Sequence, residues 1–387
     1  MLGLLTYLPT TAYLPQYFFL LAFFHVLFRD RSRFLGDFTK FRNSPAHKVN
    51  WNFLIVLVII LLSTVNRLIH WDDVGGLSEL VPYFFLLIPS YFIAISFTKA
   101  DAKVLVTLIA FESLMVVLES VMGVSTFDTM LTGFSTFEEG SFAYFSRPLG
   151  ISASSSHIAT KLFLAWLMLD FYEFKNKMWL GIKILLLAGI LLTFNRSVLL
   201  SLVVYIALKQ LVSFFKLKYK LDNAIVGFVA GVLGLISVVT LVVLKGESII
   251  NQITRNTGKV ELTGREYVWA DFMEFISRNL VFGNNSVKLW LDGYHAHNSF
   301  IEVIATNGVF IALLYFILIG RNIRNSNWYY VVAILVFGLT QYAFFWGLSL
   351  FDILFWVILF QIPDERKESN SPVLTEDVIP LQKQLID

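Results

Sequence analysis

Residues 51–70 read WNFLIVLVIILLSTVNRLIH, a run in which Arg67 is the only Asp, Glu, Lys or Arg. An α-helix crosses the ~30 Å hydrocarbon core of a bilayer with roughly 20 mostly apolar residues, so this stretch predicts a membrane-spanning helix. The whole chain of 387 residues has the same character: it is 57% hydrophobic and 15% charged, with a mean hydropathy of +0.69. A soluble chain of this length needs more charge to cover its surface. The composition therefore predicts an all-α, polytopic membrane protein.

Windows of this length predict about eleven spans (between ten and twelve) in one integral-membrane domain over residues 1–362. The first span is irregular because Pro9 and Pro15 interrupt it, so residues 1–28 fit either one kinked helix or a helix with a re-entrant stub. The polar tail 363–387 is predicted to be disordered. The predicted spans lie near residues 10–28, 51–70, 80–97, 104–122, 150–170, 179–194, 197–212, 224–244, 299–320, 328–345 and 347–362.

The distribution of Lys and Arg over the short loops predicts the orientation of the chain. The loop 29–50 is rich in both, and every second loop after it continues the enrichment, whereas the intervening short loops hold only Arg147 and Arg196. The enriched loops and the C-terminal tail are therefore predicted to be cytoplasmic. Two substantial loops, 123–149 and 245–298, then lie on the extracytoplasmic face.

Two arginines on that face lie where a span is predicted to begin. Arg147 stands before Pro148, which suits the first position of a helix, and Arg196 lies in the turn Asn195-Arg196-Ser197. An arginine there is unfavourable to its own helix, because the helix dipole already makes that end positive. Free backbone N–H groups and a guanidinium together favour a bound anion, and the planar fork of arginine fits phosphate oxygens.

The loop 245–298 adds a third arginine of this kind. Thr263 and Glu266 have the spacing of a capping box, which predicts a surface helix that begins near Thr263, ends before Gly283 and carries Arg265 in its first turn. An apolar stripe on this helix supports the prediction. The stripe consists of Val268, Trp269, Phe272, Met273 and Ile276.

Two histidines complete this group of residues. The segment His295-Ala296-His297-Asn298-Ser299 precedes the ninth predicted span, and Ser299 and Glu302 again have capping-box spacing. A neutral histidine beside cationic groups can accept a proton from a hydroxyl. Arginines and a histidine at a lipid–water boundary therefore indicate a lipid-linked phosphate substrate and attack by a hydroxyl.

The order and spacing of these motifs, over roughly residues 145–320, resemble the O-antigen polymerase and O-antigen ligase family of glycan-assembly enzymes. The chain departs from the family in having Asn195-Arg196-Ser197 where members often have Ser-Arg-Gly, in its extra His295, and in its span count, since members commonly have twelve. The matching residues are Arg147-Pro148-Leu149-Gly150, Asn195-Arg196-Ser197, Thr263-Gly264-Arg265 with Trp269, and Phe282-Gly283 followed by His297-Asn298-Ser299 and Gly308.

The resemblance implies a metal-independent, cofactor-free glycosyltransferase of the bacterial inner membrane, with its site facing the periplasm. Arg196, Arg265 and Arg147 would bind the diphosphate of the donor. His297 or His295 would take the proton of the acceptor hydroxyl, and the sequence leaves open which of the two does so. The secondary candidates for the site are Asn298, Trp269 and Glu302.

The implied partners are lipid-linked. An oligosaccharide on undecaprenyl diphosphate serves as donor and a second one as acceptor, with membrane lipids and a chain-length regulator protein as further partners. The net charge of +2 argues against nucleic acid as a partner. The absence of cysteine excludes a disulfide framework and a cysteine nucleophile.

The predicted function is that of a polysaccharide polymerase, which transfers the glycan to the hydroxyl of a lipid-linked repeat unit. A ligase would pass the same donor to lipid A–core, and the arginines do not separate the two. A flippase should show repeated halves and broken midplane helices, and the sequence shows neither.

Each candidate residue also has a simpler interpretation. Interfacial arginines can extend to lipid headgroups without a catalytic role. The two histidines with Asp292 could bind zinc, but only if ligands came from other carboxylates. Those carboxylates are Asp271, Glu274 and Glu302.

Three charged residues fall inside predicted spans. Glu112 and Glu119 lie on one face of the fourth span, and Lys161 lies near the middle of the fifth. A charge in lipid is expensive unless it is paired or faces a cavity. The sequence predicts an ion pair between Lys161 and one of the glutamates, with a substrate-facing role as the alternative.

Overall fold

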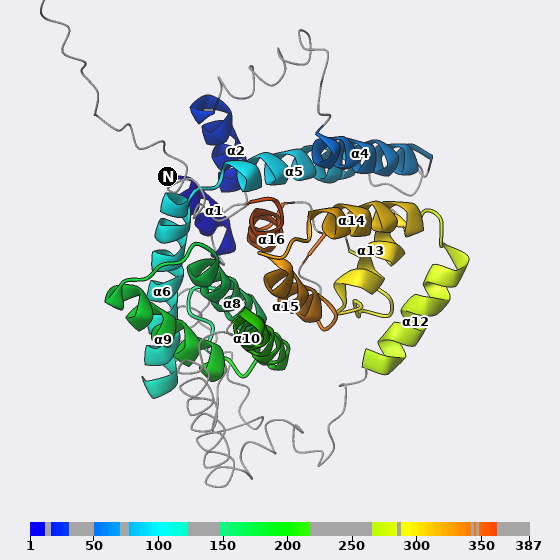
Figure 1. Cartoon of the computed structure of the whole chain (residues 1–387). Helices are drawn as coiled ribbons and strands as arrows, with labels where there is room; N and C mark the ends of the chain where they lie inside the picture. Colours follow the sequence, from blue (N-terminus) through cyan, green and yellow to red (C-terminus); the bar gives the residue numbers. More distant parts are fainter. Residues whose placement is uncertain are drawn as a thin grey trace, which may run out of the picture.

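The computed structural model of the chain describes residues 1–11, 17–30, 50–69, 77–122, 148–152, 154–216, 265–284, 288–341, 344–345 and 348–361. Over these residues the regular structure is helical, and the only β-type pairing is a single antiparallel bridge between Leu291 and Tyr294. The prediction of an all-α chain is confirmed for this part of the molecule (Figure 1).

A helix lies within each predicted span except 224–244, which is outside the described residues, as are the tail beyond residue 361 and most of the loop 123–149. The described elements are α1 (Leu2–Tyr7), η1 (Leu8–Thr10), α2 (Tyr17–Arg29), α4 (Trp51–Ile69), α5 (Leu77–Ser96), α6 (Lys99–Met122), α8 (Ser155–Phe171), α9 (Lys177–Leu192), α10 (Arg196–Lys216), α12 (Arg265–Arg278), α13 (Ser299–Asn307), α14 (Val309–Asn322), α15 (Trp328–Gly338) and α16 (Leu350–Phe360).

Three of these helices are long and apolar enough to cross a membrane. They include the segments Trp51–Leu68 of α4, Lys99–Met122 of α6 and Arg196–Ser213 of α10. Apolar side chains on α4 and α10 are exposed, among them Leu61 and Val203. Large apolar side chains exposed along a helix mark a surface that another apolar medium covers, which agrees with a membrane protein.

The helix α8 lies at the centre of the packing. Its side chains from Ile158 to Leu169 are buried on every face, whereas a helix at the surface of a fold buries only one stripe. The helices α6, α9, α10 and α16 pack against it, and α15 in turn packs against α10 and α16 (Figure 1). The position of α8 is therefore fixed by helices from several different parts of the chain.

The predicted ion pair is present at this centre. Lys161 Nζ lies 2.6 Å from Glu112 Oε2, and both side chains are fully buried. Tyr7 and Ser152 donate hydrogen bonds to the same carboxylate, at 3.1 Å and 2.6 Å. These bonds satisfy the carboxylate oxygens that burial has removed from solvent. At the other end of α8, Asp170 accepts from Lys183, Tyr205 and Lys209 at 2.5–2.7 Å and joins α8 to α9 and α10.

The predicted single span 299–320 is divided into α13 and α14 at Gly308, and this part of the prediction is wrong. Gly308 has φ +79° and ψ 169°, a conformation that only glycine adopts readily. A Cβ atom there would lie 2.0 Å from the carbonyl oxygen of Val281. The close approach of residues 280–284 to this break explains why the helix is interrupted.

Candidate functional site

The turn that carries Arg196 is fixed by the side chain of Asn195. Its Oδ1 accepts a hydrogen bond from the backbone N–H of Val198 at 3.1 Å, which makes Asn195 the N-cap of α10. Its Nδ2 donates to Ser156 Oγ in the first turn of α8, also at 3.1 Å. Arg196 is the first residue of α10, as predicted, and its side chain is half-buried. The starts of α8 and α10 therefore lie together.

The histidines lie in a loop of residues 288–298, here called the histidine loop, that leads into α13. The His295 and His297 rings have centroids 3.7 Å apart, and the His297 backbone N–H donates to His295 Nδ1 at 3.2 Å. His297 has φ +49°, which is uncommon outside glycine. The two imidazoles thus form one compact pair, in which Nδ1 of His295 serves as an acceptor.

The predicted capping box at Ser299 is wrong. Asn298 is the N-cap of α13, because its Oδ1 accepts from the backbone N–H groups of Phe300 and Ile301 at 2.9 Å and 3.1 Å. Asn298 therefore has a structural role as the cap of α13, in addition to the site role predicted for it. Ser299 is the first helical residue, and its hydroxyl donates to the carbonyl oxygen of Gln341 at 2.8 Å.

Glu302 organises the histidine loop instead of capping its helix. Its Oε1 accepts from the backbone N–H of Leu289 at 2.9 Å, and its Oε2 accepts from that of Ala296 at 3.0 Å. The side chain is fully buried. One carboxylate therefore closes the loop at both of its ends and sets the backbone between His295 and His297.

The helix α12 holds the histidine loop from the other side. The helix predicted from about residue 263 is present and begins at Arg265; Thr263 and Gly264 lie outside the described residues. The indole Nε1 of Trp269, one turn further on, donates to the carbonyl oxygen of Ala296 at 2.7 Å. Arg265 thus begins a helix that is bonded directly to the backbone between the two histidines.

The apolar face of α12 is nearly the one predicted. Phe272 and Ile276 are buried against Leu289, Ala296 and Ala305, while Val268 and Trp269 are half-buried. Met273, which the predicted apolar stripe also includes, is exposed. It lies next to Phe272 along the chain, and adjacent residues of a helix point about 100° apart, which turns Met273 away from the loop.

A single residue joins the arginine turn to the start of α13. Gln341, which follows α15, donates from its side-chain Nε2 to Ser197 Oγ at 3.4 Å, and its backbone carbonyl oxygen accepts from the Ser299 hydroxyl. Ser197 directly follows Arg196, and Ser299 is two residues beyond His297. The starts of α8, α10 and α13 with Gln341 are here called the helix-start cluster.

The segment after Arg147 forms a turn over residues 148–152, here called the Pro148 turn. Backbone N–H groups of Leu149 and Gly150 donate to Glu119 Oε2 at 3.1 Å and 2.9 Å. Arg147 itself lies outside the described residues. The expectation that Pro148 begins the helix is wrong: α8 begins at Ser155, behind the N-cap Ser154.

Two residues near these segments were not among the predicted ones. His157, in the first turn of α8, has its ring centroid 5.8 Å from that of Phe351. Lys288 in the histidine loop lies over the Trp290 ring, with Nζ 4.2 Å from the centroid, and burial lowers the pKa of its ammonium group while the charge of Glu302 opposes that shift. Lys288 also acts electrostatically on His157. His157 could have been selected as a candidate from the sequence, because it is a histidine near the start of an otherwise apolar predicted span.

The candidate ligands of a zinc site do not gather in the described part of the chain. No three His, Asp or Glu side chains are grouped there as metal ligands. Both oxygens of Glu302 already accept backbone hydrogen bonds. Metal independence itself stays a prediction.

The starts of α10 and α13, with Arg196 and the histidine pair next to them in the chain, lie in one region of the fold. The helix α12, which begins at Arg265, contacts the same region through Trp269. Helix N-termini and guanidinium groups favour a bound anion, and a histidine can accept a proton beside it. Comparison with known proteins assigns no family: no family model matches the chain, and no curated protein or solved structure is significantly similar to it.

Proposed function

We propose that the chain is a polysaccharide polymerase that transfers a glycan from undecaprenyl diphosphate to the hydroxyl of a lipid-linked repeat unit. The observation that carries the proposal is the contact through Gln341, which joins the start of α10 to the start of α13. This contact supports a single site made from Arg196 and the histidine pair, two motifs separated by about a hundred residues along the chain.

The donor would bind through its diphosphate. Arg196, at the start of α10, and Arg265, at the start of α12, would each hold diphosphate oxygens with a planar guanidinium. Arg147, next to the Pro148 turn, would be a third ligand. Negative charge grows on the diphosphate as its bond to the sugar breaks, and fixed cations stabilise such charge most in the transition state.

The acceptor would be activated by the histidine pair. The acceptor oxygen forms the new bond to the anomeric carbon, the bond from that carbon to the diphosphate oxygen breaks, and the carrier diphosphate leaves with the electron pair. The hydroxyl proton passes to a histidine. Nδ1 of His295 already accepts the backbone N–H of His297, which favours His297 as the base.

We also propose a membrane topology for the chain. About eleven spans of roughly 20 residues would place the loops 123–149 and 245–298 in the periplasm and the tail in the cytoplasm of a bacterial inner membrane. A lipid-linked donor then enters sideways from the bilayer and meets arginines at the periplasmic surface.

A deletion in the native host, complemented with variants, tests the proposal against the ligase alternative. Loss of a polymerase leaves single repeat units on lipid A–core, whereas loss of a ligase leaves finished polymer on undecaprenyl diphosphate. We expect the first result, with Arg196→Lys and Arg265→Lys failing to restore polymer although both accumulate in the membrane. Normal polymer in the deletion strain would contradict the proposal.

A further inference from the structure

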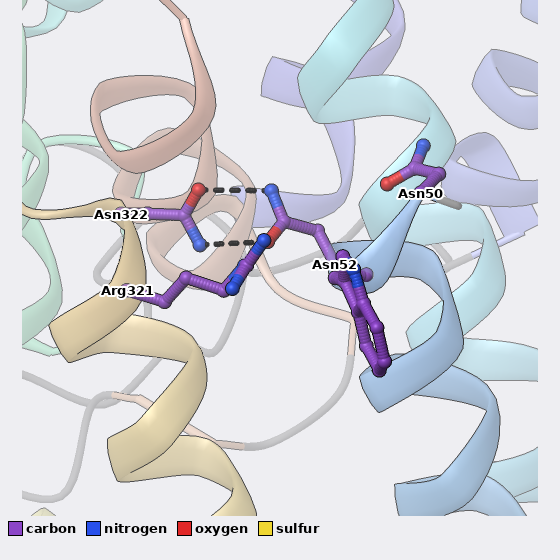
Figure 2. A pocket seen from close by; sticks show the side chains of 5 residues that line it. Asn50, Asn52, Arg321 and Asn322 are labelled. Atoms are coloured by element: carbon purple, nitrogen blue, oxygen red, sulfur yellow. Dashed lines mark hydrogen bonds between the residues drawn. The ribbon is translucent and has the colours of Figure 1, made fainter. Parts of the chain in front are cut away.

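A polar pocket lies where the start of α4 meets the end of α14 (Figure 2). The start of α4 contributes Asn50, Trp51 and Asn52 to the lining, and the end of α14 contributes Arg321 and Asn322. Its volume is about 470 Å³, within the range of ~300–1,000 Å³ typical of small-ligand sites. None of these residues belongs to the helix-start cluster or the histidine loop, so the pocket is independent of the proposed activity.

The wall of the pocket is fixed by two amide side chains. Asn52 Nδ2 donates to Asn322 Oδ1 at 2.8 Å, and Asn322 Nδ2 donates to Asn52 Oδ1 at 3.0 Å (Figure 2). Asn322 is buried and also donates to the carbonyl oxygen of Leu318 at 2.7 Å. These bonds join α4 to α14, so the pocket is formed before any ligand arrives.

Arg321 gives the pocket its positive charge. Its guanidinium carbon lies 5.9 Å from the centroid of the Trp51 ring, a cation–π arrangement that holds the group over the pocket. The Arg321 side chain is exposed, and no Asp or Glu in the described part of the chain forms an ion pair with it. Because the side chain is exposed, its N–H donors can reach the oxygens of a ligand in solvent or lipid.

The pocket lies at the end of two apolar surfaces. Trp51 is the first residue of α4, one of the helices able to cross a membrane, and tryptophan is enriched where a membrane meets water. The apolar side chains exposed beyond the pocket are Leu54, Leu57 and Leu61 on α4 and Phe310, Leu313 and Ile317 on α14. A polar, cationic pocket above such faces has the layout that a phospholipid would fill.

We infer that this pocket binds the phosphate group of an anionic glycerophospholipid. Arg321 would hold two phosphate oxygens with its planar fork, and the acyl chains would lie along the exposed faces of α4 and α14. The structural alternative is that Arg321 only complements the dipole at the C-terminal end of α14. That alternative predicts an effect of Arg321 on stability and none on lipid binding.

Native mass spectrometry of the purified full-length chain, stripped of lipid in a neutral detergent, tests the inference. Phosphatidylglycerol is titrated, and the bound lipid is counted for the wild type, Arg321→Gln and Arg321→Lys. We expect Arg321→Gln to weaken phosphatidylglycerol binding at least tenfold, with Arg321→Lys between the two. Arg278→Gln is the matched control, because Arg278 is an exposed arginine on α12 that is paired with Glu274, and it should leave binding unchanged.

Two further ligands identify the source of the phosphate. Diacylglycerol, which has the acyl chains but no phosphate, should bind no more weakly to Arg321→Gln than to the wild type. Inorganic phosphate in excess should fail to displace phosphatidylglycerol, since it has no acyl chains. Equal binding of phosphatidylglycerol to the wild type and Arg321→Gln would overturn the inference, and displacement by inorganic phosphate would overturn the assignment to a lipid.

Discussion

The Pro148 turn and the histidine loop are both held by a buried glutamate, but the two glutamates use their oxygens differently. Glu119 binds the backbone N–H groups of Leu149 and Gly150 with the same oxygen, Oε2. Glu302 uses one oxygen for Leu289 and the other for Ala296. The histidine loop therefore depends on both oxygens being acceptors, whereas the Pro148 turn depends on one.

The Pro148 turn is also connected to a buried ion pair. Ser152 donates to Glu112, whose charge is balanced by direct contact with Lys161. Lys288 acts on Glu302 as a nearby charge. The Pro148 turn is thus connected to a fully buried ion pair, whereas the histidine loop is held by the Glu302 carboxylate and by the hydrogen bond from Trp269.

The largest effect should come from breaking that ion pair. Lys161→Met alone leaves the Glu112 charge buried without its partner, which we expect to cost about 3–5 kcal/mol of stability. The double variant Lys161→Met with Glu112→Leu should recover much of that loss. Thermal unfolding in detergent measures both; a double variant as unstable as the single one would show that the charges do not act as a pair.

Gly308→Ala should be more damaging than Gly150→Ala. Both glycines have positive φ, but a Cβ at Gly308 would meet a backbone carbonyl oxygen at 2.0 Å, while at Gly150 it would meet Glu112 Cγ at 3.1 Å. A backbone atom cannot move aside as a side chain can, so we expect a loss of about 3 kcal/mol against 1–2 kcal/mol. Gly181→Ala, in open space on α9, is the control. Similar losses at Gly150 and Gly308 would mean that residues 280–284 move freely.

Glutamine replacements test the use of the two oxygens. Glu302→Gln leaves one of the two loop N–H groups facing an amide donor, which we expect to cost about 1–3 kcal/mol. Glu119→Gln can keep one oxygen toward the backbone N–H groups of Leu149 and Gly150, so the Pro148 turn should lose less than about 1 kcal/mol. Hydrogen exchange at Leu289 and Ala296, compared with Leu149 and Gly150, reports each loop directly. Equal exchange in both variants would remove the distinction between the loops.

The helices could be predicted from the sequence because a span requires a long apolar run, and the Lys161 pair because a charge in an apolar setting needs a partner. The role of Glu302 could not. Ser299 and Glu302 have capping-box spacing, but Asn298 lies one residue earlier with an amide oxygen that reaches the same N–H groups. Glu302 was then free to bind Leu289 and Ala296, whose positions depend on tertiary packing.

The contact between the starts of α10 and α13 could not be predicted from the sequence either. Gln341 contacts Ser197 and Ser299 only after three distant helices have packed together, so no local pattern marks it. The starts of α10 and α12 were predicted because both signals are local: a polar turn between two apolar runs for α10, and an apolar stripe after Arg265 for α12. A motif can be predicted from the sequence when its residues contact each other within one turn of a helix.

The central claim is that the histidine pair and the arginines form one site with separate tasks. The direct measurement compares donor binding and polymer formation for purified His297→Ala, His295→Ala and wild type. We predict that His297→Ala loses about 10²–10⁴-fold in turnover while it still binds the lipid-linked donor, and that His295→Ala loses less. Full activity in both single variants would leave the site without a base and contradict the account.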